Sequence, residues 1–146
     1  MSIFATIPSL IALSQSKAVS GEISLTCDAW QASNADAYFA VTGHWIEEKA
    51  PDEWVEHEAL FGFTQMNTAH NGVRLGQALY GICNRLGIVH KVCLDCPRQC
   101  VLNTPFQIGH ITCDNASNND TMLDEFARCY QLKIGRKFDV LRHHIQ

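Results

Sequence analysis

The sequence lacks the features of a membrane or secreted protein. None of its apolar runs is long enough to span a bilayer, and no basic residue precedes Lys17, so the charged start of a secretory signal is missing. Cysteine is present in an odd number, seven, and is partly placed inside apolar periodic segments, which is not the pattern of a secreted disulfide framework. We therefore expect a protein of a reducing compartment, with no membrane contact.

An excess of positive charge is also missing. The formal net charge is −4, so bulk charge does not favour a nucleic-acid binder. The acids are concentrated, because residues 21–66 hold nine of the fifteen acids and a single lysine, whereas the chain from residue 67 onward is mildly basic. Contact with a phosphate backbone needs a local basic patch, and Arg136 and Lys137 are the candidates for it. The alternative is that both belong to a solvated basic surface.

Apolar residues make up 47% of the chain, which is enough to bury a core and too much for a disordered protein. Apolar and polar residues alternate with the strand period in the first half, and apolar residues recur at helical spacing in two later segments. The predicted elements are a helix at 7–17, strands at 23–28, 37–46 and 56–65, a helix at 71–87, a strand at 108–114, a helix at 115–132 and a strand at 138–145.

This order of elements predicts an α/β fold on a mixed sheet. Three antiparallel strands form a meander, and a helix, a parallel strand and a second helix follow. We expect residues 1–20 to form a helical lead-in and residues 21–146 to form one domain. Residues 93–108 contain two prolines and no clear period, so they are predicted to be an irregular insertion.

The tripeptide Thr-Cys-Asp occurs twice, at residues 26–28 and 112–114, and each copy ends a predicted strand. If the two strands are parallel neighbours, Asp28 and Asp114 lie at the same carboxyl edge of the sheet, where α/β folds bind ligands. Two carboxylates held together repel each other unless a cation lies between them, and their hard oxygens suit Mg²⁺ or Mn²⁺. The alternative is that each Asp only caps a turn.

Four segments, at residues 25–30, 38–46, 70–72 and 111–119, resemble in this order the catalytic domain of hAT-superfamily transposases of the BED-finger type. The strongest motifs are Asp-Ala-Trp at 28–30 and Asp-Asn-Ala-Ser-Asn-Asn at 114–119, and the resemblance covers residues 21–138. It implies an RNase H-like fold in which Asp28 and Asp114 are the first two acids of an Asp-Asp-Glu triad. It also implies Mg²⁺ or Mn²⁺ as cofactor, transposon-end DNA as partner and a nuclear location.

The sequence departs from this family in what it lacks. The family places its final Glu downstream of a helical insertion and continues into a Cys-x-x-His segment and a dimerisation region, whereas this chain stops at Gln146 and has no BED finger. Asp124 and Glu125 are predicted to point away from the strand end, since they lie too far along their helix. We therefore expect a truncated, partial RNase H-like domain, inactive alone, in the nucleus or, as a fragment, in the cytoplasm. The alternative is a domesticated module that binds nucleic acid or protein without catalysis.

A cysteine cluster lies inside the predicted insertion. Cys93, Cys96 and Cys100, with His90 upstream, have a spacing that zinc sites use. We favour a surface insertion or a translated intron as the origin of this stretch. A zinc site, which would make the chain a small zinc-binding protein, and a redox role for the Cys-x-x-Cys pair are the alternatives.

Three further residues are candidates for contact with nucleic acid. Trp30 follows Asp28 closely, and its ring could contact DNA or pack in the core. Asn115 and Asn119 follow Asp114, and their amides could orient its carboxylate, contact phosphate or cap the helix.

Overall fold

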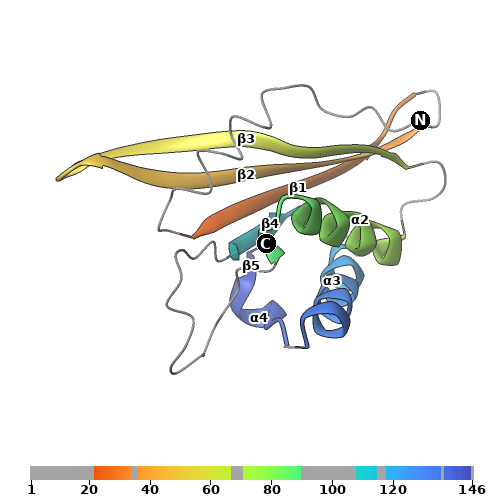
Figure 1. Cartoon of the computed structure of the whole chain (residues 1–146). Coiled ribbons are helices and arrows are strands. Elements are labelled where there is room, and N and C mark those ends of the chain that lie inside the picture. Colours follow the sequence, from red (N-terminus) through yellow and green to blue (C-terminus); the bar gives the residue numbers. More distant parts are fainter. Residues whose placement is uncertain are drawn as a thin grey trace.

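A computed structural model describes residues 22–33, 36–66, 71–89, 108–114, 118–135 and 137–145 of the chain. Within these ranges five strands form one sheet in the order β3-β2-β1-β4-β5, and helices lie beside it (Figure 1). The elements in chain order are β1 (Ile23–Gln31), β2 (Ala37–Ala50), β3 (Glu53–Met66), α2 (Gly72–Arg85), β4 (Ile108–Cys113), α3 (Asn118–Ile134), α4 (Val140–His143) and β5 (His144–Ile145).

The sheet is mixed, as predicted. β2 runs antiparallel to β1 and β3, and β4 runs parallel to β1 and β5. Figure 1 shows α2 and α3 on one side of this sheet. Burial alternates along the strands accordingly, since Leu25, Cys27, Phe39 and Val41 are buried and their neighbours are partly or fully exposed. We call the side that bears these exposed neighbours the open face.

The two helices form where the apolar spacing predicts them. Asn71 caps α2, because its side-chain oxygen accepts a hydrogen bond from the Arg74 backbone N–H at 2.9 Å. The buried side chains of α2 and α3 are spaced three and four residues apart, so each helix turns one apolar stripe inward. They are Leu75, Leu79, Ile82 and Cys83 on α2, and Met122, Leu123, Phe126 and Tyr130 on α3.

α2 and α3 approach each other closely at two glycines. A Cβ atom at Gly72 would lie 2.4 Å from the Asn118 carbonyl oxygen, and one at Gly76 would lie 2.5 Å from that of Met122. The backbones can therefore meet only because these positions carry no side chain.

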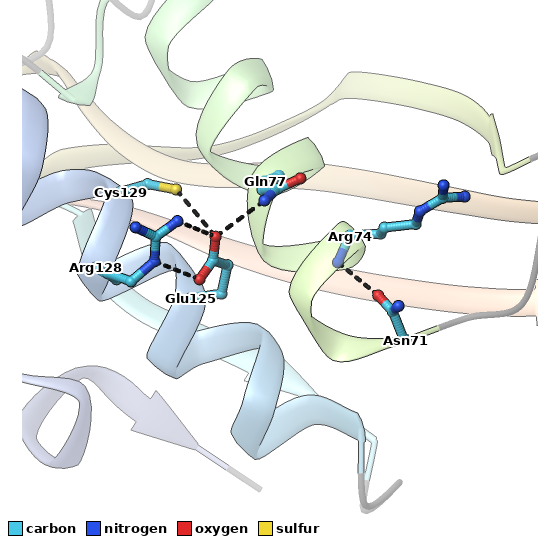
Figure 2. A network of polar contacts seen from close by, with 6 residues as sticks. All are labelled: Asn71, Arg74, Gln77, Glu125, Arg128 and Cys129. Atoms are coloured by element: carbon cyan, nitrogen blue, oxygen red, sulfur yellow. Dashed lines mark hydrogen bonds and ion pairs between the residues drawn. The ribbon is translucent and has the colours of Figure 1, made fainter.

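A buried carboxylate joins the same two helices. Glu125 of α3 accepts two hydrogen bonds of 2.7 Å from the Arg128 guanidinium and one of 3.1 Å from the Gln77 amide of α2 (Figure 2). The hydrogen bonds from Arg128 are the main cause that lowers the pKa of Glu125 to about 2, and they outweigh the opposing effect of burial. Glu125 is thus a structural anion that holds α3 against α2.

Some predicted bounds are wrong. The strand expected at 138–145 is mostly the short helix α4, because the Asp139 side chain accepts a hydrogen bond from the Arg142 N–H and caps a helical turn, which leaves only two residues for β5. β1 does not end at Asp28 but continues to Gln31, since it stays paired with β2 as far as Ala37. The predicted helix at 7–17 and the insertion at 93–108 lie outside the described residues, and the domain division stays a prediction.

Candidate metal centre and nucleic-acid surface

The two Thr-Cys-Asp tripeptides lie side by side in the sheet. β1 and β4 are parallel neighbours, with Thr26 paired to Thr112 and Cys27 paired to Cys113. Asp28 and Asp114 follow the paired cysteines directly. Because successive side chains on a strand point to opposite faces, Asp28 lies on the open face while the two cysteines face the helices. Both aspartates are exposed, and the pairing of Cys27 with Cys113 places the two acids that the sequence singled out at neighbouring positions.

Asn119 fixes the position of Asp114. Its side-chain amide donates a hydrogen bond of 2.7 Å to Asp114 Oδ1 and a second, short one to the Asp114 backbone oxygen. Asn119 is only 8% exposed, and it belongs to the first turn of α3. This is the orienting role considered for it from the sequence, and a phosphate contact by this amide stays a prediction.

The paired cysteines behind the carboxylates are buried. Cys27 and Cys113 are 6% and 5% exposed. A hydrogen bond with Cys113, together with burial, raises the pKa of the Cys27 thiol. Burial also raises the pKa of Cys83, on α2, to about 12. These thiols therefore pack as small apolar groups, as the apolar segments around them predicted.

Three aromatic rings gather on the open face near Asp28. Trp30 lies two residues beyond Asp28 on β1, and its ring centroid is 5.8 Å from those of both Tyr38 and Phe63. The Tyr38 and Phe63 rings are stacked with centroids 5.5 Å apart. Trp30 remains 39% exposed, so one ring of the cluster offers an accessible face. Sequence reasoning found Trp30 but missed Tyr38 and Phe63, although the pairing of Trp30 with Tyr38 follows from the antiparallel register.

A third carboxylate is not found beside the pair in the described part of the chain. Among those residues, no group of three or more His, Cys, Asp or Glu side chains could hold a metal ion. Asp124 is exposed on α3, and Glu125 is buried between α2 and α3 and bound to Arg128. Glu125 thus faces the second helix and not the open face, as expected from its place along α3.

Several predicted site residues lie outside the described residues. They are His90, Cys93, Cys96, Cys100, Asn115 and Arg136. Their assignment to a zinc site or to nucleic-acid contact therefore stays a prediction. Lys137 is described and is exposed between α3 and α4, and its contact with DNA likewise stays a prediction.

Comparison with known proteins gives the same ancestry as the motifs. The family model of the ZBED1 RNase-like domain matches residues 26–100, about half of the chain, a stretch that includes Asp28 and Trp30 and ends before Asp114. The Putative AC transposase and the Putative AC9 transposase of Zea mays are each 32% identical to the chain over 76 residues, which is 52% of this chain and 9% of the relative.

A third relative is the Putative transcriptional regulator tpeD of Talaromyces stipitatus, 24% identical over 110 residues, which is 75% of this chain and 11% of the relative. The chain thus spans only about a tenth of the length of these curated relatives. No solved structure matches it. In the described part of the chain, no helix is long and apolar enough to cross a membrane. The chain belongs to the ZBED1 RNase-like domain family and is related to hAT-type transposases, as its two aspartate motifs predicted.

Proposed function

We propose that this chain binds a divalent cation, Mg²⁺ or Mn²⁺, between Asp28 and Asp114 and uses it to hold the backbone of DNA on the open face. The observation that carries the proposal is the in-register pairing of the two Thr-Cys-Asp tripeptides on β1 and β4. Asp28 and Asp114 directly follow the paired cysteines Cys27 and Cys113, and this supports a site whose two carboxylates are positioned by the sheet.

The donor set fits such an ion. Mg²⁺ is usually held by one or two carboxylates, and it keeps the rest of its ligands as water and substrate phosphate oxygens. A bound cation of this class neutralises phosphate charge and can activate a water molecule for phosphoryl transfer. Asp28 is paired with Ala40 of β2, its neighbour Cys27 is paired with Cys113 of β4, and Asp114 is held by the Asn119 amide.

The aromatic cluster supports DNA as the partner. Trp30, Tyr38 and Phe63 form an apolar surface on the same face as Asp28, and exposed aromatic rings on a sheet are the usual platform for stacking an unpaired base. Two relatives are named as putative transposases and one as a putative transcriptional regulator, which supports action on DNA in the nucleus.

We further propose that the described domain does not cut DNA by itself. Its described residues supply two carboxylates to the site and no third acidic, cysteine or histidine ligand. With two protein ligands, the cation is held partly by the phosphate it binds, and nothing in the described residues fixes a second ion or orients an attacking water.

The test is Mn²⁺ binding to the full chain, followed by calorimetry or by the loss of the free-ion electron paramagnetic resonance signal. Asp28→Asn and Asp114→Asn should each weaken binding at least about tenfold. Asp124→Asn, which removes the same charge from an exposed position of α3, is the control and should leave affinity unchanged. If the control weakens binding as much as the two site variants do, the proposed metal site does not exist.

A nicking assay on end-labelled DNA with Mn²⁺ tests the second part of the proposal. We expect no cleavage. Cleavage that disappears in Asp28→Asn would show that the pair of carboxylates is sufficient for chemistry and would overturn the inactive assignment.

The second candidate is a binding module that needs no metal. The aromatic cluster favours it, because stacking on Trp30 requires no cation. DNA binding that survives chelation and the Asp28→Asn change, but is lost in Trp30→Ala, would support this candidate over the first.

A further inference from the structure

A separate groove lies on the sheet near the start of β1. It has a volume of about 660 Å³ and is lined by Glu22, Ser24, His44, Trp45, Ile46, Trp54 and Glu56. Ser24 lies four residues before Asp28, so at about 3.3 Å per residue the groove is roughly 13 Å from the carboxylate pair. Among its lining residues Trp54 is 62% exposed and Ile46 is 56% exposed, which is a large apolar surface to leave in water.

The groove opens on the most acidic part of the molecule. β2 and β3 continue as a two-stranded ribbon beyond the end of the pairing between β2 and β1 (Figure 1). Seven carboxylates and one ammonium group belong to this ribbon and to the groove, namely Glu22, Glu47, Glu48, Asp52, Glu53, Glu56 and Glu58 against Lys49.

Among the residues that the structure describes, no ion pair joins Glu22 or Glu56, the two groove carboxylates, to a cation. In the described ranges the recorded ion pairs of this region join His57 to Glu47 at 2.8 Å and His44 to Glu58 at 3.8 Å, and neither involves Glu22 or Glu56. The exposed side chains of Trp54 and Ile46, flanked by two carboxylates outside these ion pairs, favour a ligand that carries both positive charge and apolar surface.

We infer that this groove binds a basic segment of a partner protein, with an arginine side chain seated against Trp54 and Glu56. A guanidinium is planar and weakly hydrated, so it stacks on an indole ring and donates paired hydrogen bonds to a carboxylate. Aliphatic side chains of the same segment cover Ile46. The surrounding negative charge attracts such a segment from a distance.

The same charge excludes DNA from this end of the sheet. A phosphate backbone placed over Glu22 and Glu56 meets like charge, so the groove and the carboxylate pair select different partners. The groove does not depend on the proposed metal site, and each can fail without the other.

The test uses the full chain and a short fluorescein-labelled peptide of alternating arginine and leucine, followed by fluorescence anisotropy at low and high salt. The paired change Glu22→Gln with Glu56→Gln should weaken binding at least about tenfold. Trp54→Ala should weaken it similarly, and it is expected to fold because Trp54 is largely exposed.

The matched control is Asp52→Asn with Glu53→Gln, which removes the same charge from the ribbon tip outside the groove. It should change affinity less than about threefold. Asp28→Asn should leave peptide binding unchanged, and the groove variants should leave Mn²⁺ binding unchanged.

Three results would overturn the inference. Equal losses in the groove pair and the tip pair would show diffuse attraction and no site. A dimer in analytical ultracentrifugation that dissociates in Trp54→Ala would assign the groove to a second copy of the chain. A tenfold gain in peptide affinity on removing residues 1–21 would assign it to the chain's own N-terminal segment.

Discussion

Replacing Gly76 by alanine should force α2 and α3 apart. The new Cβ would lie 2.5 Å from the Met122 carbonyl oxygen and 2.7 Å from the Glu125 Cβ, both below the 3.0 Å that real Cβ contacts respect. A backbone carbonyl in a helix cannot move away as easily as the end of a side chain. The overpacking should therefore lower the free energy of unfolding by about 1–3 kcal/mol. Alanine recovers about 1 kcal/mol through its higher helix propensity. The expected net loss is therefore up to roughly 2 kcal/mol of unfolding free energy.

Gly81 provides the matched control on the same helix. A Cβ there meets nothing within 4 Å, so Gly81→Ala should stabilise the protein by up to about 1 kcal/mol through propensity alone. Urea unfolding followed by circular dichroism should therefore move the two midpoints in opposite directions. If both midpoints rise by the same amount, the close approach of the two helices is refuted.

The same pair of variants tests whether helix packing supports the site. Gly76→Ala displaces α3, whose first turn carries Asn119, so it should also weaken Mn²⁺ binding at Asp114. Gly81→Ala should leave that affinity unchanged. Equal Mn²⁺ affinity in both variants would show that the packing of α2 against α3 does not affect the proposed metal site.

The remaining predictions concern three side chains. The pKa of Glu125 is about 2 in the folded protein and about 4.3 in the unfolded chain, so the stabilisation by Glu125 is full above pH 4.3 and is lost as the pH falls toward 2. The urea midpoint should therefore fall more steeply on acidification in the wild type than in Glu125→Gln. Parallel curves for the two proteins would contradict this role of Glu125. Cys27 and Cys113 should resist iodoacetamide until the protein unfolds, as peptide mass spectrometry can measure, and rapid labelling of either thiol would contradict their burial. Asn119→Ala should weaken Mn²⁺ binding several-fold by releasing the Asp114 carboxylate, whereas unchanged affinity would show that the amide only stabilises the start of α3.

Periodicity predicted the parts of the fold in which one face is buried. The alternation at residues 23–28 and the helical spacing around Leu79 and Phe126 correspond to β1, α2 and α3, because burial on one side imposes those periods. The repeated Thr-Cys-Asp motif predicted the juxtaposition of the two aspartates, which the parallel register bears out.

Features that depend on individual side-chain contacts could not be predicted from periodicity. The strand predicted at 37–46 continues to Ala50 as β2, since cross-strand contacts of His57 with Glu47 and Trp45 stabilise a polar pair of strands. In the turn that follows, Asp52 has a φ of 65°. The pattern of apolar residues in the sequence does not predict such a backbone conformation. The hydrogen bond from Asn119 to Asp114 likewise depends on where α3 begins.

The central position of β1 has a consequence for how the site comes into being. Its pairing with β2, which in turn pairs with β3, is local and belongs to residues 23–66, whereas its pairing with β4 joins Cys27 to a partner 86 residues later. Closing so long a segment has a large entropic cost, and such pairings form late in folding. Asp28 therefore belongs to the meander of β1, β2 and β3, which forms early, and Asp114 follows β4, which joins the sheet later. A chain still emerging from the ribosome has the acidic ribbon before it has a pair of carboxylates, so the proposed affinity for a divalent ion would mark the finished fold.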